Sequence, residues 1–109
     1  MARSIEIDSN QVEWRPMRYP GISNKSLRRD PVTEARVSLM RFEPGAYLPL
    51  HEHPEGEEVF VMEGRVRFEQ TWYEAGFYLY SPPDSLDDVY SDTGAVILVS
   101  LPKPAVHPE

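Results

Sequence analysis

Prolines and glycines divide this chain into short apolar segments, and that division limits what the chain can fold into. Eleven prolines and six glycines are spread over 109 residues. The apolar runs between them are about four to eight residues long, shorter than an ordinary helix of about 11 residues. The pattern therefore predicts an all-β protein, a sandwich or barrel built from many short strands.

Individual strands can be placed from the alternation of side chains. Between Glu34 and Phe42, Arg36, Ser38 and Met40 share one face, as in a half-buried strand. Further candidates, separated by turn residues, are YLPLHEH, EVFVMEG, RVRFEQ, GFYLYS, DDVYS and AVILVSL. The last of these is apolar on both faces, which predicts a strand buried on both sides or covered by a partner subunit.

A chain of this length has room for one domain with a single modest core. We expect residues 1–30 to form an extended segment that covers a sheet edge. Residues 36–101 should form the barrel, and residues 102–109 a frayed tail. The sequence assigns no role to His107 within that tail.

Composition excludes several classes of function. The chain has no cysteine, so disulfides, thiolate metal ligands and a cysteine nucleophile are ruled out. Its formal net charge of -7 disfavours binding to nucleic acid or anionic membranes, which requires clustered lysine and arginine. There is no secretory signal and no run of about 18 apolar residues, so we expect a soluble cytoplasmic protein with a small-molecule partner.

Two histidines and a glutamate form the candidate metal site. Residues two apart on a strand point to the same face about 6.5–7 Å apart, so His51 and His53 can direct both imidazoles to one point. A divalent cation in a partly dry cavity also favours an anionic ligand. Glu57, which opens the next strand after a tight turn, can supply it, with Glu55 and Glu58 as rivals on spacing alone.

The spacing of these residues resembles the first motif of the cupin superfamily, G-x5-H-x-H-x3-E-x6-G. All its fixed positions are filled, by Gly45, His51, His53, Glu57 and Gly64. Within the superfamily, residues 36–101 are most similar to the ChrR-type cupin domain of zinc-binding anti-sigma factors.

The second cupin motif, G-x5-P-x-G-x2-H-x3-N, is degenerate in this chain. Gly76 and Pro82 match it. Its glycine, histidine and asparagine positions are held by Asp84, Asp87 and Ser91. The histidine position is the important one, because in the superfamily that residue is a metal ligand.

The resemblance implies a small single-domain cupin jelly-roll β-barrel that binds one divalent metal ion, iron, zinc or manganese. The implied ligands are His51, His53 and Glu57, joined by Asp87 if the aspartate replaces the missing histidine directly. Two carboxylates would shift the preference from copper and nickel toward iron, manganese or zinc. Without Asp87, two histidines and one carboxylate leave open positions, as in non-haem iron oxygenases.

The pocket beside the metal should be mainly apolar and suited to a small organic ligand. Val59 and Val61 should face inward with Glu57, and Arg36 could pair with an anionic substrate if its face of the strand points inward. The remaining predicted pocket residues are Met40, Tyr47, Tyr78 and Tyr80.

Three functions stay open on the sequence alone. The first is a metal-dependent enzyme of dioxygenase type that acts on a small organic acid, diketone or phenolic compound. The second is a non-catalytic metal or small-ligand binding or sensing module, and the third is a metal-free scaffold. We also expect a homodimer, because the two-faced apolar strand at residues 95–101 and the extended N-terminal segment offer surface to a second copy.

Overall fold

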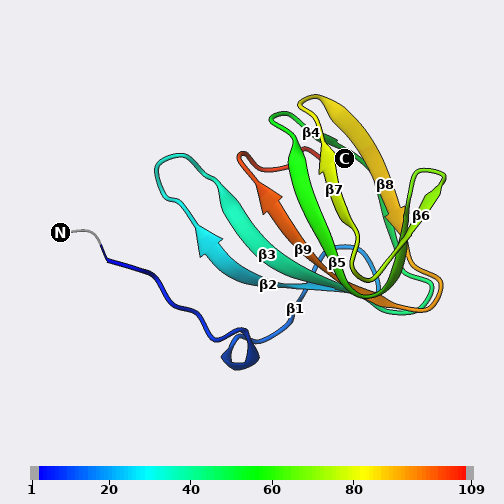
Figure 1. Cartoon of the computed structure of the whole chain (residues 1–109), viewed down its shortest axis with the longest axis horizontal. Helices are drawn as coiled ribbons and strands as arrows, with labels where there is room; N and C mark the ends of the chain where they lie inside the picture. Colours follow the sequence, from blue (N-terminus) through cyan, green and yellow to red (C-terminus); the bar gives the residue numbers. More distant parts are fainter. Residues whose placement is uncertain (1–2, 108–109) are drawn as a thin grey trace.

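The computed structural model describes residues 3–107, which form a curled antiparallel β-sheet (Figure 1). A single turn of 3-10 helix, η1 (Ser9–Gln11), precedes the strands. The strands are β1 (Arg15–Pro16), β2 (Ile22–Arg29), β3 (Arg36–Phe42), β4 (Tyr47–His53), β5 (Glu57–Phe68), β6 (Thr71–Glu74), β7 (Tyr78–Ser81), β8 (Ser85–Tyr90) and β9 (Ala95–Leu101). Across residues 3–107, no helix has the length and apolar character needed to cross a membrane. The prediction of an all-β protein is confirmed.

The strand order places β5 at the centre of the curl. The order is β1-β2-β3-β9-β5-β8-β4, and β6 and β7 pair with β5 outside this path. The first half of β5 pairs with β7 and β9, and its second half pairs with β6 and β8. In Figure 1 the sheet folds over along β5, so that β2, β3 and β9 form one wall while β4 and β8 form the other.

Gly64 allows β5 to pass from one wall to the other. Its φ is 70°, a left-handed conformation that favours glycine. A Cβ atom at this position would overlap the carbonyl oxygen of Gly94 on the neighbouring chain segment. The last fixed glycine of the first motif therefore permits both the bend and the close approach of the two backbones.

The hydrophobic core lies between the two walls. Its buried residues come mainly from β2, β3, β4, β5, β8 and β9 and are Ile22, Met40, Phe42, Ala46, Leu48, Val59, Val61, Val66, Phe68, Val89, Ala95, Ile97 and Val99. Residues 95–101 form β9, which lies between β3 and β5 in the sheet. Their apolar character predicts a strand that is buried on both faces or covered by a partner subunit. One of its faces is buried in this core, while Val96 and Leu98 on the other face are half-buried.

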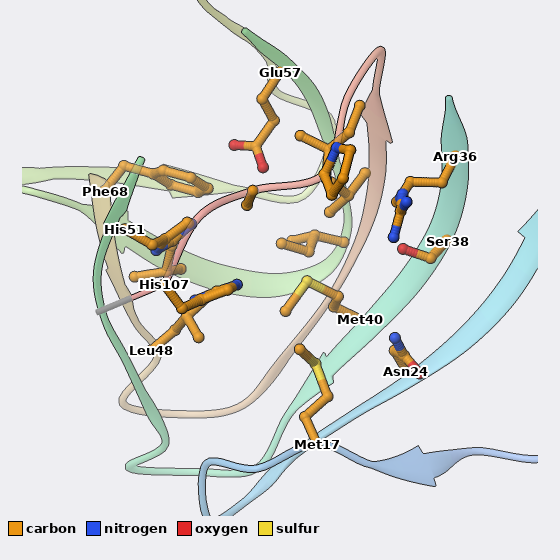
Figure 2. Close-up of a pocket in the computed structure, with 16 residues that line it drawn as sticks. Met17, Asn24, Arg36, Ser38, Met40, Leu48, His51, Glu57, Phe68 and His107 are labelled. Carbon is orange, nitrogen blue, oxygen red and sulfur yellow. The ribbon is translucent and has the colours of Figure 1, made fainter. Parts of the chain in front are cut away.

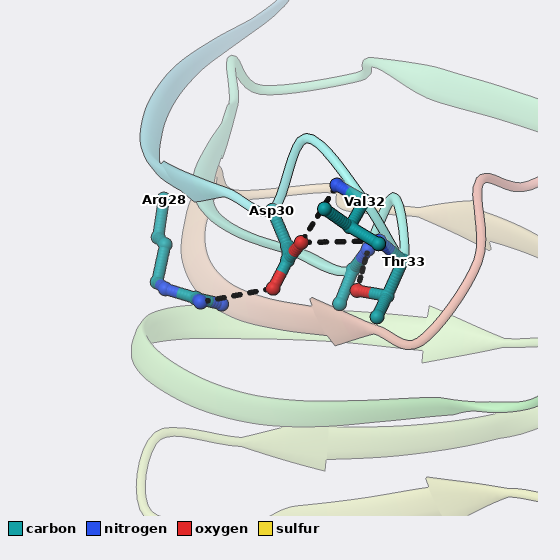
Figure 3. A network of polar contacts seen from close by, with 5 residues as sticks. Arg28, Asp30, Val32 and Thr33 are labelled. Carbon is teal, nitrogen blue, oxygen red and sulfur yellow. Dashed lines mark hydrogen bonds and ion pairs between the residues drawn. The ribbon is translucent and has the colours of Figure 1, made fainter.

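The loop between β2 and β3 is closed by Asp30 (Figure 3). One carboxylate oxygen accepts hydrogen bonds from the backbone N–H groups of Val32, at 2.8 Å, and Thr33, at 3.0 Å. The other oxygen lies 3.3 Å from Nη2 of Arg28. These donors stabilise the ionised carboxylate and lower the pKa of Asp30. The loop is thereby held in one shape.

Segments near both ends of the described residues are paired with the sheet, although residues 3–14 belong to no strand. At the N-terminal side, β1 pairs with β2 and β2 pairs along the whole of β3. At the C-terminal side, Val106 forms an antiparallel bridge to Glu52 on the outer strand β4. Lys103 donates a hydrogen bond of 2.7 Å to the carbonyl oxygen of Thr33. The residues after β9 therefore cross the open side of the curl, where the sequence predicted a frayed tail.

Candidate metal centre

β4 and the start of β5 position the three predicted first-motif ligands. His51 and His53 turn inward from β4, and Glu52 between them is exposed. The turn containing Gly56 reverses the chain, so that Glu57 opens β5 with its side chain buried. One ligand atom from each of His51, His53 and Glu57 lies within 4.8 Å of the others. These three residues, the triad, form a group that could hold a metal ion.

The ligand atoms of the triad are shielded from water. The exposed fraction is 4% for His51, 0% for His53 and 6% for Glu57. Nε2 of His53 and Oε1 of Glu57 have no hydrogen-bond partner among the described residues. Buried polar atoms without a partner are rare, because each costs about 1–3 kcal/mol. A cation bound to both atoms would remove that penalty, so the donor set fits a metal ion.

The backbone sets the orientation of His51. Its Nδ1 lies 2.9 Å from the carbonyl oxygen of Pro49, a geometry that requires the proton on Nδ1 and leaves Nε2 free. Its ring meets that of His53 edge to face, with 4.6 Å between centroids. Burial lowers the pKa of His51 to about 4, because the charged imidazolium is poorly solvated there. His51 is therefore neutral near pH 7, the form that binds metals.

Asp87 and Glu57 lie at opposite nitrogens of the His53 ring. Asp87 is on β8, directly opposite His51 in the strand register. Its Oδ2 lies 3.4 Å from Nδ1 of His53 and accepts a hydrogen bond of 3.2 Å from Ser81. Oε2 of Glu57 lies 3.3 Å from Nε2 of His53. Asp87, the fourth predicted ligand, is outside the group formed by the triad.

These neighbours shift the pKa values of the site. Burial raises the pKa of Glu57 to about 7, although the nearby His53 acts against this shift. Burial alone would lower the pKa of His53, but Asp87 and Glu57 outweigh it and raise the pKa. For Asp87, burial alone would raise the pKa, but His53 and Ser81 outweigh it and lower the pKa. The raised pKa values of His53 and Glu57 favour the protonated forms of both groups, and a bound cation would displace those protons.

Two residues of the triad, His51 and Glu57, line a cavity of about 250 Å³ (Figure 2). Arg36 and Met40, both predicted as pocket residues, line it together with Ser38 from the same face of β3. In Figure 2 Arg36 and His51 lie on opposite sides of the cavity. Most of the remaining wall is apolar and comes from Met17, Leu48, Phe68, Val89, Ile97, Val99 and Leu101.

The tyrosines predicted for the pocket lie outside it. Tyr78 and Tyr80 on β7 are 57% and 59% exposed. They pair with Phe60 and Glu58, which occupy the outer face of β5. The alternation within β7 was visible in the sequence, but the register that decides which of its faces points inward was not.

Tyr47 is also on the outer surface, 43% exposed, and it donates a hydrogen bond of 2.7 Å to Asp88. Simple alternation along β4 would place it on the same face as the two histidines. A register shift between Leu48 and His51 breaks that alternation, so Leu48 faces inward in place of Tyr47.

Two further predictions concern the valines of β5. Val59 and Val61 face inward and are 2% and 0% exposed, but they pack in the core and do not line the cavity.

The cavity wall also includes Asn24 and His107, which the sequence did not predict. The only available signal for His107 was that it is the third histidine of a chain with a metal motif.

Two residues that depart from the second motif, Asp84 and Ser91, still support the backbone at their positions. Asp84 stands at the glycine position and adopts a φ of 67°, a conformation that aspartate tolerates better than most side chains. Ser91, at the asparagine position, is fully buried. Its hydroxyl donates to the carbonyl oxygen of Arg65 at 2.7 Å and accepts from the N–H of Gly94 at 2.9 Å. The turn and strand end of the motif are thus preserved without its usual residues.

Comparison with known families accounts for both the fold and the motif. A family described as the ChrR Cupin-like domain matches residues 2–104. The chain belongs to the ChrR cupin-like family. The predicted resemblance to ChrR-type cupins is confirmed, and so is the cupin fold. No curated protein sequence matches this family member significantly.

Solved structures agree with the cupin fold of this ChrR cupin-like protein. A structure assigned as an acetylacetone dioxygenase from Methylibium petroleiphilum superposes with a TM-score of 0.92 at 18% identity, covering 100% of this chain and 83% of that one. An acetylacetone dioxygenase from Acinetobacter johnsonii gives 0.81 at 16% identity, covering 96% and 76%. The complex of Rhodobacter sphaeroides SigE with the anti-sigma ChrR gives 0.73 at 21% identity, covering 84% and 49%. At these identities the likeness establishes the fold.

Proposed function

We propose that this ChrR cupin-like protein is a metal-dependent enzyme of dioxygenase type that acts on a small organic acid, diketone or phenolic compound. The observation that carries the proposal is the convergence of His51, His53 and Glu57 beside a largely apolar cavity, which His51 and Glu57 line. Two imidazoles and one carboxylate leave coordination positions open for a substrate or oxygen, an arrangement that suits non-haem iron.

The three triad residues would hold the metal, and iron, zinc or manganese suits their nitrogen and oxygen atoms. When bound, the metal would supply Lewis acidity and, if it is iron, redox chemistry with oxygen. The protein contributes a rigid and dry setting for that chemistry. Burial keeps His51 neutral and Pro49 orients its ring, while Glu57 supplies negative charge once its proton is displaced.

We assign Asp87 a positioning role in place of the ligand role that the second motif implies. Its carboxylate lies against Nδ1 of His53 and is itself held by Ser81. Accepting the Nδ1 proton fixes the tautomer of His53 and leaves Nε2 for the metal. The negative charge of Asp87 would also make Nε2 of His53 a more basic, stronger ligand for the metal ion.

The cavity favours a substrate with an apolar body and an anionic or enolic oxygen. Arg36 lies across the cavity from His51 (Figure 2). Its Nε donates a hydrogen bond of 3.2 Å to the carbonyl oxygen of Glu34, which orients the guanidinium. Among residues 3–107, no carboxylate forms an ion pair with Arg36. A substrate oxygen could provide the missing anion, since guanidinium groups recognise such oxygens well.

A sensing module is the second candidate, and the family match and the ChrR neighbour favour it. In that case the site would bind a metal or a small ligand without turnover. Oxygen uptake separates the two candidates. Ferrous protein should consume oxygen with at least one member of a panel of β-diketones and catechols, and His51→Ala should not. Wild-type protein that binds iron but consumes no oxygen with any member would favour the sensing module.

A further inference from the structure

The chain after β9 forms one wall of the cavity. This segment, residues 102–107, is called here the C-terminal strap. Lys103 binds the carbonyl oxygen of Thr33 at 2.7 Å. At the other end, Glu52 and Val106 exchange two backbone hydrogen bonds of 2.9 and 2.8 Å. The strap therefore spans the open side of the curl between the β2–β3 loop and β4 (Figure 1).

One anchor point of the strap lies in the β2–β3 loop and the other lies in the sheet. Thr33 belongs to the loop that Asp30 closes (Figure 3). Glu52 lies between the two triad histidines on β4. Pro104, Ala105 and His107 of the strap line the cavity. The strap is thus built into the site, because its last anchor is a residue of the metal-binding strand itself.

His107 is held directly beside the triad. Its ring stacks on that of His51 with 4.9 Å between centroids and 20° between planes. Tyr19 lies on another side, with 5.9 Å between centroids. The ring also borders a shallow hollow on the outer surface, formed with Leu50 and Leu86, so it separates the cavity from that surface.

One atom of His107 is left without a partner. Its Nδ1 is buried and has no hydrogen bond among the described residues. Stacking on His51 would be served equally well by an aromatic ring without nitrogen. His107 lines the cavity, and its unpartnered nitrogen would gain a partner if the ring turned to present it to a carbonyl, enolate or phenolic oxygen of a molecule held there.

We propose that His107 is a ligand-binding residue of this site, which forms a hydrogen bond through Nδ1 with an oxygen of the small molecule held between the triad and Arg36. His107 lies outside the group of convergent ligand atoms, and its ring stacks on His51 instead of converging with it. It therefore contacts the molecule that the triad binds, and the metal is held without it. This inference rests on the proposed function of the triad.

Two substitutions separate the hydrogen bond from the packing. His107→Phe keeps an aromatic ring that can stack on His51 but removes both nitrogens. His107→Asn keeps a polar group close to the position of Nδ1. The full-length proteins would be loaded with Co²⁺, whose visible absorption reports ligand binding without turnover. The probes are acetylacetone, catechol and benzoate, and cobalt content is measured by elemental analysis.

We expect His107→Phe to bind the best of the three probes about 10-fold or more weakly than wild type. His107→Asn should bind within about threefold of wild type. Cobalt content should be unchanged in both variants.

Four results would overturn the inference. Equal probe affinity in wild type and His107→Phe would remove His107 from the binding site and leave the proposed function intact. Loss of cobalt in His107→Phe would make the residue a metal ligand. An equal loss of probe affinity in both variants would assign the effect to ring shape. Wild-type protein that binds no cobalt, or none of the three probes, would overturn both this inference and the proposed function.

Discussion

Oδ2 of Asp87 lies 3.4 Å from Nδ1 of His53. The contact is on the side of the ring that faces away from Glu57, whose carboxylate lies 3.3 Å from Nε2. Asp87, at the histidine position of the second motif, therefore contacts a histidine of the triad. Removing such a partner usually lowers metal affinity by about 10–100-fold.

This relationship predicts different results for two substitutions of Asp87. Asp87→Ala should weaken metal binding by about 10-fold or more, because Nδ1 of His53 loses its charged acceptor and keeps only the hydroxyl of Ser85, 3.4 Å away. Asp87→Asn should weaken it less, because the amide oxygen can still accept the Nδ1 proton. Both affinities can be measured by competition with a coloured chelator. Equal losses in the two variants would instead indicate that Asp87 binds the metal through its carboxylate.

The raised pKa of Glu57 predicts how the metal-free protein responds to pH. The folded-state pKa is about 7, above the unfolded value near 4.5, so folding retains a proton. The stabilising contribution is present at low pH and is lost as pH rises through about 7. Between about pH 6 and 8, the stability of wild type relative to Glu57→Gln should fall by about 1 kcal/mol.

Urea unfolding with a chelator present measures this difference at each pH. The comparison with Glu57→Gln reports on Glu57 together with its interaction with His53, because Glu57 helps to raise the pKa of His53. The pKa shift of His51 contributes to both proteins. Parallel stability curves for the two proteins over this pH range would show that Glu57 is not buried as described.

Two glycines with positive φ should respond differently to alanine. Gly64 has a φ of 70°, and an added Cβ would overlap Gly94. Gly76 has a φ of 100°, and an added Cβ would meet nothing within 4 Å. Gly76→Ala should cost about 1 kcal/mol from backbone strain alone. Gly64→Ala should cost about 3 kcal/mol or more, measured by thermal unfolding, and similar values for both would contradict the bend at Gly64.

Arg36 should select anionic ligands. Arg36→Gln in Co²⁺-loaded protein should bind benzoate about 10-fold more weakly, because a charge-assisted hydrogen bond is lost. Arg29→Gln is the matched control, since Arg29 is paired with Arg36 in the sheet register but is exposed and does not line the cavity. An equal effect of both substitutions would indicate a general effect of charge and not a contact with the ligand.

Much of the fold could be predicted from local patterns. The alternation in residues 36–42 and the apolar run at 95–101 correspond to β3 and β9. The face of β3 that carries Arg36 and Met40 does line the cavity. Strand length and side-chain periodicity are local properties, so the sequence alone reveals them.

The failures involve relations between distant segments. Tyr47 was misplaced by a bulge, and Tyr78 and Tyr80 by an unknown register with β5. Spacing located Asp87 in the second motif but did not show which nitrogen of His53 it would face. The strap that brings His107 to the site is anchored by Lys103 at Thr33 and by a bridge from Val106 to Glu52, 54 positions earlier in the chain, and no local pattern indicates either contact.

The account depends most on one metal ion held by His51, His53 and Glu57. Elemental analysis of protein purified without chelator or nickel resin tests it directly, with Glu52→Gln as the control for a neighbouring acid that is exposed. Wild type and Glu52→Gln should each contain one transition metal ion per chain, and His51→Ala and Glu57→Gln should lose it. A wild-type protein that takes up no metal under any loading condition would contradict the account.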